Sequence, residues 1–162
     1  MIFTKSKKYE DITSKLDKDN DAIAIIGCET CVRTAGSGGE AKLVSLAKQL
    51  KKDGYNVVEG FMIPSTCTPK TYFADVDSKV NTIVSLACSA GSSNMKRYFP
   101  TCKLVESIDD IGLMVTDSKK EIIKVSMPYA DYKNEVNNEY DFYTGAKRDT
   151  NDTLTNMEVD KW

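Results

Sequence analysis

Two short runs of apolar residues constrain the fold of this chain more than any other feature. Residues 22–26 and 82–87 are almost continuously apolar and rich in β-branched side chains. A half-buried strand alternates apolar and polar residues, whereas an unbroken apolar strand is covered on both faces. Such strands are typical of a parallel sheet that lies between layers of helices. The sequence therefore predicts an α/β fold.

The remaining pattern extends this prediction. A helix between a Ser37–Glu40 capping box and Gly54 has one apolar face, and a shorter amphipathic helix is expected at 6–18. We expect a three-layer, mainly parallel sheet of the Rossmann or flavodoxin-like type, with an additional hairpin turning at 117–120. The further expected strands are 56–63, 103–106, 111–116 and 121–127, and the further expected helices are 70–78 and 93–99.

Composition changes near the C-terminus. From residue 128 onward Asn, Asp, Lys and Tyr dominate, and the apolar periodicity fades. Low hydrophobicity favours disorder, but the aromatic residues of this segment favour an ordered arm. We therefore divide the chain into an α/β domain, 1–127, and a polar tail or packing arm, 128–162.

Charge and composition exclude several classes of function. The 162 residues carry a formal charge of −2, without the basic excess of a nucleic-acid-binding protein. No run of eighteen apolar residues is present, and the N-terminus lacks a signal-peptide pattern, so we expect a cytoplasmic protein without a membrane segment. The sequence contains no histidine, which excludes Ser–His and Cys–His nucleophiles. No catalytic residue is predicted.

Four cysteines follow predicted strands. Cys28 and Cys31 come directly after 22–26, Cys67 follows 56–63, and Cys88 follows 82–87. The carboxyl ends of parallel strands lie side by side, and ligands bind at that edge. We therefore expect these four thiols to meet and to bind a metal ion or a cluster. Cys102 is expected to be a buried structural thiol.

The spacing of the thiols leaves alternatives. One close Cys-x2-Cys pair with two distant single cysteines favours a [4Fe–4S] cluster over structural zinc, which usually has two close pairs. A dithiol redox pair of Cys28 and Cys31 is a third interpretation, but a glycine-rich loop separates Cys31 from the expected helix start. Small residues around the thiols let a bulky group approach the backbone. The candidate cofactor-binding glycines are Gly27, Gly38, Gly39 and Gly91.

These motifs resemble a known family. The opening residues 1–4, the segment Ile25-Ile26-Gly27-Cys28-x-Thr30-Cys31-Val32, Gly38-Gly39-Glu40 at a helix start, Cys67, and Leu86-Ala87-Cys88-Ser89-Ala90-Gly91 occur in this order. The chain resembles, over about residues 1–106, the cysteine-containing methylenetetrahydrofolate reductase C-terminal domain. In acetogens and related anaerobes that domain is a small separate subunit. Two features depart from the family pattern: Ala35 stands where many relatives have a further cysteine, and no second cysteine-rich half follows.

The resemblance implies a function. Members of this family are thought to carry iron–sulfur centres, or zinc in some descriptions, and to pass electrons to a flavin-containing methylenetetrahydrofolate reductase subunit. By this resemblance the chain is a non-catalytic, one-cluster electron-transfer subunit of an oxidoreductase in one-carbon metabolism. The alternative is a zinc-stabilised interaction module without redox activity.

Overall fold

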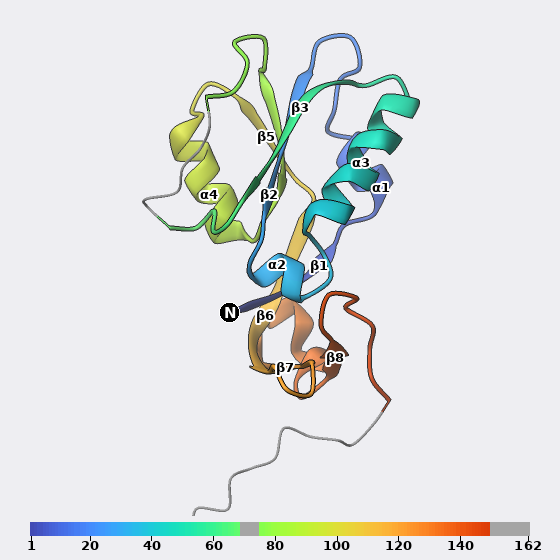
Figure 1. The fold of residues 1–162 in the computed structure, drawn as a ribbon, viewed down its shortest axis with the longest axis vertical. Coiled ribbons are helices and arrows are strands. Elements are labelled where there is room, and N and C mark those ends of the chain that lie inside the picture. Colours follow the sequence, from blue (N-terminus) through green and yellow to red (C-terminus); the bar gives the residue numbers. More distant parts are fainter. Residues whose placement is uncertain (69–74, 150–162) are drawn as a thin grey trace, which may run out of the picture.

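The computed structural model describes residues 1–68 and 75–149. Its elements form two sheets with helices between and around them (Figure 1). In chain order they are β1 (Ile2–Ser6), α1 (Tyr9–Thr13), β2 (Ala22–Cys28), α2 (Cys31–Thr34), α3 (Glu40–Lys52), β3 (Asn56–Ile63), β4 (Thr82–Leu86), α4 (Ser89–Tyr98), β5 (Lys103–Glu106), β6 (Ile108–Asp117), β7 (Ile122–Pro128), the 3₁₀ helix η1 (Ala130–Glu135) and β8 (Glu139–Asp141).

The first sheet is parallel, as the apolar runs predict. Its strand order is β3-β2-β4-β5, and all three pairings are parallel. Helices α1 and α3 lie on one side of this sheet and α4 lies on the other (Figure 1). Because helices cover both sides, the side chains of Ile23, Ile25 and Val84 are completely buried. The prediction of an α/β fold with a parallel sheet is thus confirmed.

The second sheet is antiparallel and was not expected in this form. Its order is β1-β6-β7-β8, so it combines the N-terminal strand with three strands from the C-terminal part. Strands β6 and β7 form the expected hairpin. The core of this sheet is separate from that of the parallel sheet and consists of Phe3, Ala35, Ile111, Met114, Ile123, Val125 and Tyr140.

Three local predictions differ from the structure. The expected helix at 6–18 is the short helix α1, preceded by a strand whose partner β6 is a hundred residues away. Ser37 does not cap α3, because its hydroxyl bonds to Thr4 Oγ1 and to the Val32 carbonyl, and Gly39 is the N-cap. The helix expected at 93–99 begins at Ser89, directly after Cys88.

Three further expectations concern the end of α3, the helix at 70–78 and the C-terminal segment. Gly54 ends α3 with a φ of 87°, as predicted. Of the helix expected at 70–78, residues 70–74 lie outside the described residues, and residues 75–78 are not helical. The segment expected as a tail or arm begins with η1 and β8, and β8 pairs with β7.

Candidate functional site

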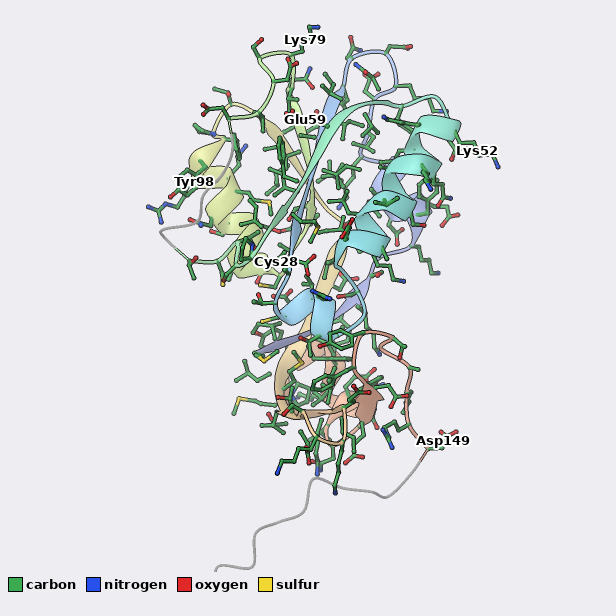
Figure 2. The ribbon with its side chains drawn as sticks, in the orientation of Figure 1. Cys28, Lys52, Glu59, Lys79, Tyr98 and Asp149 are labelled. Carbon is green, nitrogen blue, oxygen red and sulfur yellow. The ribbon has the colours of Figure 1, made fainter. Side chains whose placement is uncertain are left out.

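Cys28 and Cys88 lie at the carboxyl ends of two neighbouring strands. The last register pair of β2 and β4 is Gly27 with Leu86, so the next residues along both strands lead directly to the two cysteines. Figure 2 shows Cys28 at the end of the sheet that faces α2, whereas Lys79 lies at the opposite end. Both thiols are buried. Parallel pairing therefore brings together two cysteines that are sixty residues apart.

Cys67 reaches the same region from β3. Ile63, the last residue of β3, pairs with Cys28, and the segment that follows runs toward α4. Asn94 of α4 holds this segment, because its side-chain amide donates to the carbonyl oxygens of Thr66, at 2.8 Å, and Thr68, at 3.1 Å. The Cys67 thiol is exposed and lies 3.6 Å from Ser65 Oγ. The segment thus presents Cys67 to solvent beside the start of α4.

Cys31 is positioned by the second sheet. It is the first residue of α2 and packs against the core of the antiparallel sheet, which includes Ile111. Its thiol is partly exposed. The glycine-rich loop separates Cys31 from the start of α3, as expected, but a further single-turn helix that the sequence does not predict, α2, begins at Cys31 itself. The glycine-rich loop follows α2 and precedes α3.

The electrostatics of Cys88 indicate that three of the thiols are close. Burial is the largest cause that raises the pKa of the Cys88 thiol, and a hydrogen bond from the Gly91 N–H opposes it. Electrostatic interaction with Asp110, and after it with Cys31 and Cys67, raises this pKa further. Such effects fall off with distance, so Cys31, Cys67 and Cys88 lie in one neighbourhood. The fourth thiol, Cys28, lies with its Sγ 3.1 Å from Thr30 Oγ1.

Asp110 is a site residue that sequence reasoning missed, because the Asp109–Asp110 pair reads as a solvated surface. Its carboxylate accepts from the backbone N–H of Ser89, at 3.1 and 3.2 Å, and from Ser89 Oγ, at 2.6 Å. The negative charge thereby sits at the N-terminus of α4, where the helix dipole favours it. Burial, Asp110 and Cys88 together raise the pKa of the nearby Tyr129 hydroxyl. No local pattern in the sequence signals that β6 delivers a carboxylate to α4.

The thiols do not form a closed coordination shell. Within residues 1–68 and 75–149, no group of three or more Cys, Asp or Glu side chains is arranged so that it can hold a metal ion. All five cysteines are free thiols. Cys102 precedes β5 at the opposite end of the sheet, where its thiol lies 3.8 Å from the Val80 carbonyl oxygen. The arrangement therefore consists of four thiols on adjacent segments, apart from Cys102.

The four candidate glycines lie in different surroundings. A side chain at Gly27 would meet Met62 Sδ at 2.5 Å, and one at Gly38 would meet Val32 Cγ2 at 2.5 Å, so both glycines make room for core packing. Gly39 has a φ of 87° and begins α3. Gly91 lies in the first turn of the helix that follows Cys88, and its backbone N–H acts to lower the pKa of that thiol.

Comparisons of this chain with protein-family models, with curated proteins and with solved structures gave no match. The resemblance to the methylenetetrahydrofolate reductase C-terminal domain therefore rests on the sequence motifs quoted above. None of the helices in the described part of the chain is both long and apolar enough to cross a membrane.

Proposed function

We propose that this chain binds one metal centre through Cys28, Cys31, Cys67 and Cys88, and that the centre is a [4Fe–4S] cluster. One observation carries the proposal: the segments with these thiols follow the carboxyl ends of the three adjacent parallel strands β3, β2 and β4. Thiolates are the ligands of such clusters, and the sequence has no histidine to take their place.

The strand order supports a ligand site at this edge. We infer that the parallel sheet is of the doubly wound, flavodoxin-like type, because the order β3-β2-β4-β5 reverses between β2 and β4. In sheets of this type ligands bind outside the carboxyl ends of the strands, at the point of reversal. Cys28 and Cys88 follow the two strands on either side of that point.

The donor chemistry fits a cluster or a soft metal ion. All four candidate ligands are sulfur, and the Gly91 N–H lies where it lowers the pKa of one of them, Cys88. Closing the site requires the side chains of Cys67 and Cys31 to turn toward Cys88. Cys67 is exposed and Cys31 is partly exposed, so burial hinders neither movement. When bound, a cluster supplies one-electron transfer. The chain itself holds the ligands, supplies backbone N–H donors and keeps Cys28 and Cys88 away from solvent.

The identity of the electron partner rests on the family resemblance alone. We propose a cytoplasmic electron-transfer subunit, not itself catalytic, for a flavin-containing methylenetetrahydrofolate reductase. Mixing the anoxically purified protein with such a flavoprotein would give a stable complex and cluster-dependent reduction of the flavin. Absence of both would remove the partner from the proposal but leave the metal site intact.

Metal analysis tests the site itself. Protein purified without oxygen would contain about four iron and four sulfide per chain and absorb broadly near 400 nm. The variant Cys88→Ser would lose this iron, while Cys102→Ser would keep it, because Cys102 lies at the other end of the sheet. Iron retained in Cys88→Ser would refute the assignment. Colourless protein with one zinc per chain would replace the cluster by the structural zinc alternative.

A further inference from the structure

The hydroxyl group of Thr66 is buried without a hydrogen-bond partner. Thr66 is completely inaccessible to solvent, and among the described residues its Oγ1 has no partner. Its backbone, in contrast, is held in place, because the carbonyl oxygen accepts from Asn94. Leaving a buried hydroxyl unsatisfied costs about 1–3 kcal/mol. Such groups are rare in folded proteins and require a reason.

The unpartnered hydroxyl of Thr66 packs against the first turn of α4, the helix that follows Cys88. A Cβ placed on Gly91 would lie 2.2 Å from Thr66 Oγ1 and 2.8 Å from the Ala87 side chain. Ala87 precedes Cys88, and Gly91 follows it by three residues in the first turn of α4, where its backbone N–H acts to lower the pKa of the Cys88 thiol. The hydroxyl therefore packs against Gly91, in the helical turn that begins directly after Cys88. Gly91 has no side chain, and this leaves room for the hydroxyl at that place.

Metal binding would change what the Cys88 sulfur can accept. A neutral thiol is a weak acceptor, but a cysteine that binds a metal ion does so as a thiolate. A thiolate at the start of the ten-residue helix α4 also interacts favourably with the helix dipole. Thiolate formation thus creates a strong hydrogen-bond acceptor near the Thr66 hydroxyl, which is a donor without an acceptor.

We propose that Thr66 is a positioning residue whose hydroxyl donates a hydrogen bond to the Cys88 thiolate when a metal centre is bound. This inference rests on the proposed function, since it needs a metal at Cys88. Together with the Gly91 N–H it gives the sulfur two donors, which fix its orientation and spread its charge. Partners of this kind, one shell beyond the metal, commonly change metal affinity by about 10–100-fold.

The test uses the full-length, fully reduced protein and Co²⁺ as the probe, since the thiolate-to-cobalt charge-transfer bands report sulfur ligation directly. Affinity is measured by competition with a chelator for the wild type, Thr66→Val, Thr66→Ser and Cys88→Ser. Thr66→Val would bind Co²⁺ about 10–100-fold more weakly, with altered charge-transfer bands, and Thr66→Ser would restore both. Denaturation of the metal-free proteins would show Thr66→Val to be as stable as the wild type or more stable, because it removes an unsatisfied hydroxyl.

Different results overturn different statements. If the wild type binds Co²⁺ through Cys88 and Thr66→Val binds it equally well, the inference is wrong and the proposed metal site stands. If metal-free Thr66→Val is destabilised and Thr66→Ser is not, the hydroxyl has a structural role and the inference is again wrong. If the wild type shows no thiolate-to-cobalt bands, or if Cys88→Ser keeps them unchanged, the proposed function fails and the inference fails with it.

Discussion

The backbone N–H of Tyr143 donates to the carbonyl oxygen of Thr34 over 2.8 Å. Thr34 ends α2, the helix that begins with Cys31, and Tyr143 follows β8 of the antiparallel sheet. The Arg33 guanidinium, 5.5 Å from the centre of the Tyr143 ring, adds a second contact. The C-terminal part of the chain therefore holds in place the segment that carries one of the candidate ligands.

Substitution of Gly36 tests this connection. Gly36 has a φ of 73°, and a Cβ there would lie 2.3 Å from the backbone of Thr144. We expect Gly36→Ala to lower the free energy of unfolding by about 3 kcal/mol or more, because backbone strain and a backbone clash add. Denaturation in urea measures this change, and alkylation of Cys31 would become faster.

Gly54→Ala is the matched control. Gly54 has a φ of 87°, but nothing lies within 4 Å of a Cβ built there. Only the conformational penalty applies, and we expect a loss of about 1–2 kcal/mol with Cys31 alkylation unchanged. An equal loss of stability in the two variants would show that the turn at residues 142–145 does not contribute to the effect at Gly36.

Asp110→Asn should lower the pKa of the Cys88 thiol. Burial is the largest cause that raises this pKa, and it remains in the variant, so the pKa stays above its ordinary value. Removing the Asp110 charge nevertheless makes the thiolate easier to form. The rate at which iodoacetamide modifies Cys88, measured by mass spectrometry as a function of pH, would therefore rise at a lower pH than in the wild type.

Asp109→Asn serves as the comparison. Asp109 is adjacent in sequence but pairs with Lys7, at 2.5 Å, whereas Asp110 is the carboxylate that raises the pKa of Cys88. Its alkylation profile should match that of the wild type. A shift of the same size in both variants would mean that general surface charge, and not the position of Asp110 at α4, sets the pKa.

Stability at acid pH should depend on Glu135. Burial alone would raise the pKa of its carboxyl, but hydrogen bonds from Lys5, Tyr140 and Asn138 outweigh burial and lower the pKa from 4.5 to about 2. A carboxyl whose pKa is lowered on folding stabilises the protein above its unfolded pKa, and that contribution is lost as pH falls through the folded pKa. Glu135→Gln would therefore be less stable than the wild type at pH 7 by about 1–2 kcal/mol, with allowance for solvent screening.

Urea denaturation at pH 7, 4 and 2.5 would check this expectation. The difference between Glu135→Gln and the wild type should shrink steadily over this range. Exposed Glu40→Gln provides the control, because no side-chain partner of Glu40 lies in the described residues. A difference that stays constant from pH 7 to pH 2.5 would contradict the role assigned to the carboxylate.

The parallel sheet could be predicted from the sequence because its strands carry their own signal. Residues 23–26 are buried on both faces of the sheet, so every one of these positions is apolar. Strand β1 carries no such signal, because the adjacent residues Phe3 and Thr4 are both buried. Phe3 lies in the core of the second sheet, and Thr4 is hydrogen-bonded to Ser37. The sequence of strand β8, Glu-Tyr-Asp, has no strand pattern either. Both strands exist through pairing with distant strands, which a local pattern does not report.

The candidate site divides in the same way. It could be predicted that the three cysteine segments leave the same edge of the sheet, because the carboxyl ends of parallel strands share one edge. The positions of Asp110 and of the Thr66 hydroxyl could not be predicted, since each depends on how a loop or a second sheet packs against α4. The burial of Cys28 with Thr30 as its partner is likewise a matter of side-chain packing.

The antiparallel sheet combines β1 with β6, so its first strand leaves the ribosome about a hundred residues before the strand that completes it. Until translation reaches β6 and beyond, α2 lacks the turn that fastens it, while the parallel strands that carry Cys28 and Cys88 are already synthesised. The nascent chain therefore passes through a stage in which the strands that lead to Cys28 and Cys88 are present but the backbone contact that holds the helix of Cys31 is missing.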